Sequence, residues 1–214
     1  MDELKEVKNA YNSIAERFLI SRSQNIGIMG FQNREVEQPT MYSLVPNKLH
    51  NKKLLDLGCG PGIHLKEYSQ RGAQCFGLDL SEEMIKLAQK NCPQAIFKVG
   101  SVYQIDYEDN YFDIVTASFL LDNVPDLNKA ISEIRRFLKK NGQFIYSVPH
   151  PIIYMFRDSE KNKFVPSNSY FDTLPFYYNI ARGGKIFPQF PRLLEDYINT
   201  FLDSDFKLVK FIEN

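Results

Sequence analysis

The chain has 214 residues, 43% of them hydrophobic, which is enough for one sizeable core in a single domain. Its 26 basic residues balance its 26 acidic ones, which argues against nucleic acid as a partner, and no apolar run approaches the roughly 18 residues of a membrane span. The charged N-terminus does not resemble a secretory signal, and the three cysteines, Cys59, Cys75 and Cys92, have no CxxC spacing, so we expect a cytoplasmic protein without disulfides.

Two helices are predicted ahead of the first strand. Apolar residues recur at helical spacing between Leu4 and Phe18, which predicts an amphipathic helix over 3–19. Residues 20–40 are polar and irregular, and they end at Pro39, which suits the first turn of another short helix. We expect this N-terminal part to form a helical cap on the domain that follows.

From residue 52 onward, strand patterns alternate with helix patterns. Apolar runs predict strands over 53–57, 73–80, 95–99, 111–118 and 143–148. Helices are predicted between them at 63–72, at 82–91 with Ser81 as N-cap, and from Asp126 to the Asn141-Gly142 pair. This alternation is typical of an α/β fold: a doubly wound, Rossmann-like and mostly parallel sheet flanked by helices.

After the fifth predicted strand the alternation stops. Residues 150–190 hold ten aromatic side chains mixed with prolines, and the Gly183-Gly184 pair could turn a hairpin. This aromatic-rich insertion is either a small satellite core beneath a long connection or a lid over a substrate, and the two interpretations are compatible. A helix over roughly 191–203 and a strand at 206–212 are predicted to close the chain.

The most specific motif, LLDLGCGPG, stands where the first predicted strand turns into a helix. Its alternating glycines, Gly58, Gly60 and Gly62, aim backbone N–H groups at a ligand that approaches closely. Dinucleotide folds use G-x-G-x-x-G instead, and here Ile63 takes the place of the last glycine. Asp56 would repel a pyrophosphate but suits a ligand with an ammonium group, which favours an amino-acid-bearing ligand over NAD.

The second predicted strand ends at Asp79, 21 residues after Gly58. A carboxylate at this place can accept both hydroxyl groups of a ribose. The alternative is that Asp79 caps the next helix, but Ser81 already has that role. We therefore interpret Asp79 as a ribose-binding residue.

The motifs LLDLGCGPG and GLDLSEEMI, and the run from FDIVTAS to IYSVPHP, resemble successive motifs of the class I S-adenosylmethionine-dependent methyltransferases. The resemblance extends from about residue 9 to the C-terminus and is closest to the small-molecule, methyltransferase type 11-like branch. It implies S-adenosylmethionine as cofactor and S-adenosylhomocysteine as product. The cofactor-binding residues that it implies are Tyr11, Asp56, Gly58, Cys59, Gly60, Asp79, Leu80, Ser101, Val102 and Ser118.

The resemblance also implies a division of the chain and of the cofactor site. Asp79 would hold the ribose, Leu80 would pack on the adenine, Ser118 would line the methionine end and Tyr11 would close over the cofactor. The chain is expected to be one domain over 1–214, with a cap at 1–50, a cofactor-binding core at 51–149, a lid or substrate segment at 150–190, and a C-terminal helix and strand at 191–214.

Two features depart from the family's pattern. The family usually has Gly-Asp after the third strand, whereas this chain has Gly100-Ser101, so the adenine amino group loses a carboxylate acceptor and we expect weaker binding. The family's sheet also has a seventh, antiparallel strand, and the segment at 206–212 matches only the sixth. We therefore expect the seventh strand to be missing, so that either the chain is truncated or the sixth strand pairs at an unusual place, since an unpaired edge beside the fifth strand would be costly.

Methyl transfer from a sulfonium requires mainly that the acceptor is held in line in a dry pocket. A general base is needed only if the attacking atom carries a proton, and His150 is the candidate, the alternative being a turn residue before Pro151. Tyr154 and Tyr178 are the candidate substrate-binding residues in the aromatic segment.

No metal is expected. Asp122-Asn123 is similar to the metal-binding pair of catechol methyltransferases, but here the pair follows the fourth strand rather than the fifth. His50 and His64 are interpreted as surface or helix residues without a role in the site, and Cys59 as a packing residue rather than a nucleophile.

The leading hypothesis is a methyltransferase for a small-molecule acceptor. One alternative is a protein of the same fold that binds the cofactor without transferring its methyl group. The other is an NAD-dependent oxidoreductase, but this sequence lacks the G-x-G-x-x-G motif of that class. The acceptor, the methylated atom and the oligomeric state are left open by the sequence.

Overall fold

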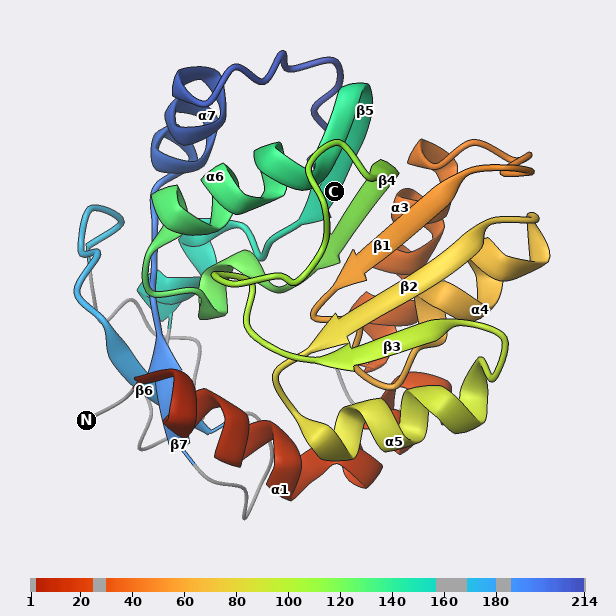
Figure 1. Cartoon of the computed structure of the whole chain (residues 1–214). Helices are drawn as coiled ribbons and strands as arrows, with labels where there is room; N and C mark the ends of the chain where they lie inside the picture. Colours follow the sequence, from red (N-terminus) through yellow and green to blue (C-terminus); the bar gives the residue numbers. More distant parts are fainter. Residues whose placement is uncertain (1–2, 25–29, 157–168, 180–185, 214) are drawn as a thin grey trace.

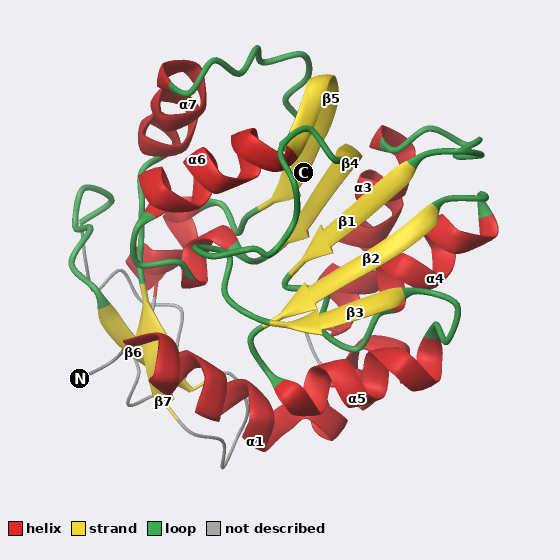
Figure 2. Cartoon of the chain, viewed as in Figure 1, coloured by secondary structure: helices red, strands yellow, loops and turns green. Residues whose placement is uncertain are grey.

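The computed structural model describes residues 3–24, 30–156, 169–179 and 186–213, and its centre is a five-stranded sheet (Figure 1, Figure 2). The strands run parallel in the order β3-β2-β1-β4-β5. Their bounds are β1 Lys53–Leu57, β2 Gln74–Asp79, β3 Ile96–Val99, β4 Phe112–Ser118 and β5 Leu138–Ser147. Chain order reverses beside β1, where ligands bind in such sheets, and the predicted doubly wound fold is confirmed.

Each face of the sheet packs against its own helices. Leu54 belongs to a buried cluster with residues of α4 (Ile63–Gln70) and α5 (Glu82–Asn91). Leu55 belongs to a second cluster, with residues of α6 (Leu127–Phe137) and α7 (Leu194–Asp203). Successive side chains of a strand point to opposite faces, so burial of both faces explains why β1 is apolar throughout except for Asp56 and its first residue.

Two predicted helix starts are confirmed by hydrogen-bonded caps. Ser81 Oγ accepts from the Met84 N–H at 3.1 Å, and Asp126 Oδ1 accepts from the Lys129 N–H at 3.0 Å. Each cap satisfies one of the N–H groups that the first turn of a helix leaves without an intrahelical partner.

The N-terminal cap consists of α1 (Glu3–Gln24), η1 (Gln32–Glu37) and α3 (Gln38–Leu44). α1 lies near the carboxyl ends of β2 and β3 (Figure 1) and is longer than the predicted 3–19. Pro39 stands in the first turn of α3, as predicted. η1 is a π-helix, which the sequence did not indicate, and helices of this rare type are frequent at functional sites.

The segment after β5 forms η3 (Pro151–Phe156) and an antiparallel pair, β6 (Phe176–Asn179) with β7 (Ile186–Gln189). The Gly183-Gly184 turn lies outside the described residues, but the pairing on either side of it fits the predicted hairpin. α1 lies beside this hairpin (Figure 1), and Tyr177 Oη donates to Glu6 Oε2 at 3.1 Å.

Two strand predictions differ from the structure. β5 begins at Leu138, ahead of the predicted 143, because residues 138–142 extend from α6 instead of ending a longer helix. The predicted strand at 206–212 is wrong, since this segment follows α7 without strand conformation. A segment becomes a strand only where it pairs with a neighbouring strand. In the described part of the chain, no segment pairs with the outer edge of β5.

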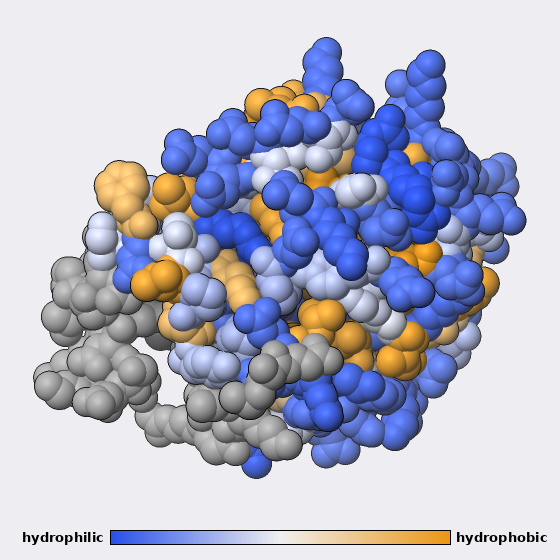
Figure 3. Space-filling model, turned by 60° about the vertical axis from the view of Figure 1, so that its left-hand side comes forward, coloured by the Kyte–Doolittle hydropathy of each residue, from blue (hydrophilic) through white to orange (hydrophobic). Residues whose placement is uncertain are grey.

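The C-terminal segment is also unusually exposed for its composition. Val209 is 88% exposed, and Leu208, Phe211 and Ile212 are exposed as well. On the face drawn in Figure 3, hydrophobic residues form separate patches within a mostly hydrophilic surface. Within the described ranges, no helix combines the length and apolar character that a bilayer crossing requires.

Candidate functional site

The glycine loop after β1 is built for close approach. Gly58, Gly60 and Gly62 have φ of 60°, 51° and 77°, a backbone region that residues with a side chain rarely adopt. A Cβ at Gly62 would lie 3.1 Å from the Ala88 backbone, so this glycine lets α4 begin against α5. At Gly60, only Phe18 Cε1 of the cap comes within 4 Å of such a Cβ, at 3.7 Å, so a side chain at this position would meet little else in the described chain.

Asp79 ties the end of β2 to this loop. Its Oδ2 accepts from the Gly60 N–H at 2.8 Å, and its Oδ1 accepts from the Ser81 N–H at 2.8 Å. Burial raises the pKa of Asp79 to about 6 although these hydrogen bonds act against the rise. A carboxylate oxygen can accept more than one hydrogen bond, so Asp79 retains acceptor capacity for a ligand's hydroxyl groups.

Asp56 is buried beneath the loop. It is 1% exposed, and its Oδ1 accepts from Thr116 Oγ1 of β4 at 2.7 Å. Burial raises the pKa of Asp56 to about 6, while His64 and Thr116 lower it. Its carboxyl group therefore joins β1 to β4 below the glycine loop.

The cap brings Tyr11 and Leu80 together beside the end of β2. Both pack against the buried Val7 and Ala10 of α1. Asn12, the next residue along α1, holds the helix in place because its Oδ1 accepts from Ser81 Oγ at 2.6 Å. Sequence reasoning did not identify Asn12, whose only signal was its position beside Tyr11.

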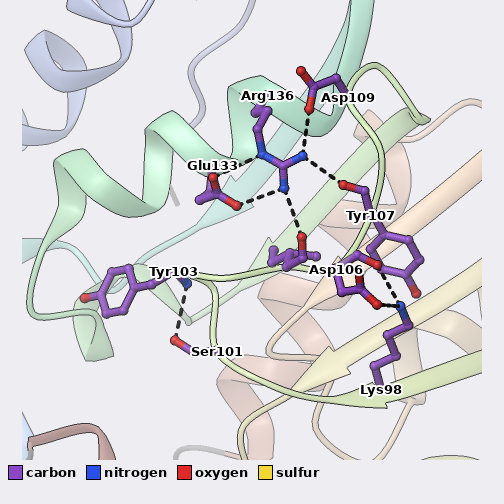
Figure 4. Close-up of polar contacts among 9 residues, drawn as sticks. Lys98, Ser101, Tyr103, Asp106, Tyr107, Asp109, Glu133 and Arg136 are labelled. Carbon is purple, nitrogen blue, oxygen red and sulfur yellow. Dashed lines mark hydrogen bonds and ion pairs between the residues drawn. The ribbon is translucent and has the colours of Figure 1, made fainter.

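Ser101 and Val102 follow β3 as predicted, and the loop that they begin is held by Arg136 of α6. Val102 is 8% exposed in the core, and Ser101 Oγ accepts from the Tyr103 N–H at 3.2 Å. As Figure 4 shows, the Arg136 guanidinium reaches into this loop. Its contacts are the carbonyl oxygens of Ile105 and Tyr107 and the carboxylates of Asp109 and Glu133.

Glu37 is a further site residue that the sequence did not reveal. Its Oε1 accepts from Ser118 Oγ at 2.6 Å and from Ser147 Oγ at 2.9 Å, which places it over the carboxyl ends of β4 and β5. Its Oε2 lies 3.4 Å from His64 Nε2. Burial alone would raise the pKa of Glu37, but His64 and Ser118 outweigh it and hold the pKa below its usual range.

The placement of His64 and Arg22 completes this polar region. His64 lies in α4, so its interpretation as a helix residue is confirmed, but at 3% exposure it is buried rather than at the surface. The Arg22 guanidinium lies 4.4 Å from the centre of the Phe18 ring. Burial lowers the pKa of Arg22, and the nearby Glu37 opposes that change.

The residues predicted for catalysis and substrate binding lie in the segment after β5. His150 Nε2 lies 2.8 Å from Glu213 Oε1, and its Nδ1 accepts from the Ile152 N–H at 3.1 Å, so both ring nitrogens have partners. Tyr154 is buried, and its ring packs edge-on against Phe176 of β6 at 5.7 Å between centroids. Tyr178 is a residue of β6.

The cysteine of the glycine loop and the Asp122-Asn123 pair are engaged in packing and in hydrogen bonds. Burial raises the pKa of the Cys59 thiol, and its Sγ lies 2.9 Å from where a Cβ at Gly77 would stand, which makes it a packing residue. Asn123 donates to Asp122 Oδ1 and accepts from Gln189 Nε2, so the pair ties η2 (Leu121–Asn123) to β7. A search of the described residues finds no cluster of metal-ligating side chains.

These residues fit a nucleoside joined to an amino acid. Asp79 has carboxylate oxygens that suit the hydroxyl groups of a ribose, and only Phe18 lies near the Cα of Gly60. Arg22 Nε is buried without a hydrogen-bond partner in the described part of the chain, and Glu37 Oε2 lies beside His64. S-Adenosylmethionine carries the ribose, cation and carboxylate that such groups would bind.

Comparison with known proteins gives consistent results. A family model described as a methyltransferase domain matches residues 55–146. An uncharacterized protein of Haemophilus influenzae is 40% identical over 138 residues, covering 60% of this chain and 54% of the relative. A demethylmenaquinone methyltransferase of Lactiplantibacillus plantarum is 32% identical over 151 residues, covering 66% and 62%. The chain thus matches less than two thirds of the length of these curated relatives.

Solved structures agree in fold. The crystal structure of a proposed S-adenosylmethionine-dependent methyltransferase from Listeria monocytogenes aligns with a TM-score of 0.72 at 26% identity, over 83% of this chain and 87% of that one. A second S-adenosylmethionine-dependent methyltransferase, from Mesorhizobium loti, aligns with a TM-score of 0.66 at 24% identity, over 80% and 81%.

Proposed function

The chain belongs to the class I S-adenosylmethionine-dependent methyltransferases, and from that membership we propose that it methylates a small-molecule acceptor by in-line displacement. The observation that carries the proposal is the hydrogen bond from the Gly60 N–H to Asp79 Oδ2, at 2.8 Å. This hydrogen bond joins the glycine loop to the acidic end of β2. It therefore supports the proposal that these two motifs of the family act together on one ligand.

The chain's own residues would hold the cofactor at several places. Asp79 would accept from the ribose hydroxyl groups, and Leu80 and Tyr11 would form an apolar wall beside them. The Ser101-Val102 loop would flank the adenine, and Ser118 would line the methionine end. When bound, S-adenosylmethionine supplies a methyl group that its sulfonium charge has already activated. The protein then needs to exclude water and orient the acceptor.

The acceptor side is proposed to lie between the cap and the segment after β5. α1 contacts the β6–β7 hairpin through Glu6 and Tyr177, and Tyr154 packs on the same hairpin through Phe176. One relative is named a demethylmenaquinone methyltransferase, which supports a small organic molecule as the acceptor class. A general-base role for His150 stays a prediction, and it would require His150 to leave Glu213.

The proposal is tested first by ligand binding and then by turnover. At about 100 times its Kd, S-adenosylhomocysteine should stabilise the protein by about 2.7 kcal/mol, a rise of roughly 5–11 °C in Tm. Formation of S-adenosylhomocysteine from S-adenosylmethionine with quinol and other small acceptors then tests transfer. Binding without turnover across a broad acceptor panel would favour the alternative of a cofactor-binding protein, and absence of binding would contradict both.

A further inference from the structure

Two serine hydroxyl groups at the carboxyl edge of the sheet share one hydrogen-bond acceptor. Ser118 ends β4 and Ser147 ends β5, and both donate to the same oxygen, Glu37 Oε1, at 2.6 Å and 2.9 Å. Glu37 is 6% exposed, whereas both serines are half-buried. Of the three residues, the serines are therefore the ones that a ligand at this edge of the sheet would meet first.

The carboxylate fixes the direction in which each hydroxyl proton points. A serine hydroxyl has one proton to donate and two lone pairs that accept, and an ionised carboxylate only accepts. Burial alone would raise the pKa of Glu37, but His64, 3.4 Å from its other oxygen, and Ser118 hold the pKa below its usual range. Glu37 is thus ionised at neutral pH, and the protons of both serines are committed to it.

The two serines differ in the acceptor capacity that remains. Ser147 Oγ also accepts from the Phe119 N–H at 3.3 Å. Among the described residues, nothing donates to Ser118 Oγ. Ser118 therefore offers an acceptor and no donor to a ligand, and such an oxygen suits an O–H or N–H group.

The turn after β4 sets these hydroxyl groups beside the glycine loop. Leu120 Cδ1 lies 2.9 Å from where a Cβ at Gly58 would stand. The preceding residue, Phe119, has φ of 49°, in the left-handed region that a bulky residue seldom adopts. Its N–H donates to the Ser147 carbonyl oxygen at 3.0 Å, and its own carbonyl oxygen accepts from Asn123 Nδ2 at 3.1 Å. Strained backbone that its surroundings hold in this way is concentrated at functional sites.

We propose that the methyl acceptor carries a hydroxyl or N–H group that donates to Ser118 Oγ, and that its proton leaves through Ser118 to Glu37. This inference rests on the proposed function and names the chemical class of its acceptor. As the acceptor atom bonds to the methyl carbon, the electron pair of the carbon–sulfur bond passes to sulfur. The acceptor's proton passes to Ser118 Oγ while the serine's own proton passes to Glu37 Oε1, so that charge is balanced.

The proposal differs from two other accounts of these residues. A purely structural Glu37 would fasten η1 to the sheet, and its replacement would then affect all acceptors alike. His150 is the other candidate base, but both of its ring nitrogens are engaged, one by Glu213 and one by the Ile152 N–H. Glu37 already has a hydroxyl donor in place and needs no such rearrangement.

The first test measures the binding of small probes to the full chain saturated with S-adenosylhomocysteine. Hydroquinone and p-phenylenediamine carry O–H and N–H donors, and 1,4-dimethoxybenzene has the same ring without a donor. Calorimetry compares the wild type with Ser118→Ala, Ser118→Thr and Glu37→Gln. Glu35→Gln is the matched control, because Glu35 is an exposed carboxylate of the same helix, η1.

We expect the wild type to bind a donor-bearing probe at least about tenfold more tightly than 1,4-dimethoxybenzene, as for one hydrogen bond. Ser118→Ala should remove this preference, because alanine has no acceptor, and Ser118→Thr should retain it. Glu37→Gln should reduce the preference, because an amide NH2 group can donate to Ser118 Oγ. The preference is a ratio taken within each variant, so a change in cofactor affinity does not affect it.

Turnover supplies a readout that a structural role of Glu37 would not change. With quinols and phenols of graded acidity, Glu37→Gln should lower kcat about 100-fold for acceptors that are neutral at the assay pH, as for loss of a general base. Acceptors that are already ionised at that pH have no proton to lose, so their kcat should change much less. Glu35→Gln should match the wild type with both kinds of acceptor.

The outcomes distinguish this inference from the function on which it rests. If the wild type does not bind S-adenosylhomocysteine, the proposed function fails. If it binds but shows no preference for donor-bearing probes, or if Ser118→Ala keeps that preference, the inference is overturned while the function stands. Equal losses of kcat for neutral and ionised acceptors in Glu37→Gln, or wild-type turnover only of acceptors without an O–H or N–H group, would also overturn it.

Discussion

At the scale of single residues, the ends of β1 and β2 each carry a carboxyl group whose pKa burial raises to about 6. The two groups differ in what surrounds them. Asp79 accepts two backbone N–H groups and faces the glycine loop, whereas Asp56 accepts a hydroxyl group from β4 and is 1% exposed. Protonation should therefore affect ligand binding through Asp79 and stability through Asp56.

Replacement of Asp79 should weaken every ligand that contains the ribose. In Asp79→Asn, the amide NH2 group would face a backbone N–H donor, and we expect the affinity for 5′-methylthioadenosine to fall at least about tenfold. In the wild type, lowering the pH from 7.5 to 5 should reduce that affinity by about tenfold, because a pKa near 6 leaves most Asp79 protonated at pH 5. Calorimetry between pH 5 and pH 7.5 checks both expected losses of affinity. A wild-type affinity that does not change with pH would contradict the assignment of Asp79 to the ribose.

Replacement of Asp56 should stabilise the protein at neutral pH. Its pKa is higher in the native state than the unfolded value of about 3.9, so its contribution to stability is complete below that value and is lost as the pH rises through about 6. Asp56→Asn cannot ionise, and Thr116 can still donate to its amide oxygen. We expect a gain of about 1–3 kcal/mol at pH 7.5, measured by urea unfolding, and no gain at pH 4.

Asp113, near the amino ends of β1 and β4, offers a control in which the pKa shift has the opposite sign. Burial alone would raise the pKa of Asp113, but Lys139, the Lys53 N–H and Lys52 hold it below its usual value. Asp113→Asn should therefore be less stable than the wild type at pH 7.5. Equal effects of the two substitutions would show that burial of Asp56 is not the cause.

Some site residues could be predicted from the sequence and others could not. Asp79 and the glycines belong to local motifs at strand ends, and their positions follow from the strand pattern. Glu37 lies in an irregular polar stretch, and its partners Ser118 and Ser147 are 81 and 110 residues away along the chain. A contact of this range has no local signal, and the same holds for the contact between Glu37 and His64.

At the scale of elements, the loop after β3 depends on one side chain of α6. Arg136 donates to two backbone carbonyl oxygens of this loop and bridges Asp109 and Glu133 (Figure 4). Arg136→Ala should cost about 1–3 kcal/mol, since buried carbonyl groups lose their donors. It should also weaken adenosine-containing ligands through Ser101 and Val102. Thermal unfolding and calorimetry check these effects against Arg135→Ala, which should change neither property.

Element boundaries show what local pattern can and cannot determine. Ser81 and Asp126 cap their helices as predicted because a cap depends on residues only three apart. The strand predicted at 206–212 failed because strand formation depends on a partner elsewhere in the chain, and composition alone does not supply one. The π-helical geometry of η1 was likewise invisible, since its sequence resembles ordinary polar helix or loop.

At the scale of the whole molecule, we expect self-association through the outer edge of β5, with which no described strand pairs, and through the exposed apolar segment 208–212. Unpaired strand edges and exposed apolar side chains both promote contact between copies. The double substitution Val209→Lys and Phe211→Lys should reduce concentration-dependent light scattering and leave Tm within about 2 °C, because both side chains are mostly exposed. Unchanged scattering would show that these residues do not cause association.

The attachment of the cap has a consequence for how a ligand enters. The cap is held by polar contacts to distant residues, such as Asn12 to Ser81 and Glu37 to Ser118, and by a small apolar cluster, while the sheet is held by two larger apolar clusters. Such a unit should open locally at a lower free energy than the sheet unfolds. Amide hydrogen exchange should then be faster in α1 than in β1 and β4, and it should slow in α1 when S-adenosylhomocysteine binds. The rate at which the cap opens would then limit the rate of cofactor exchange.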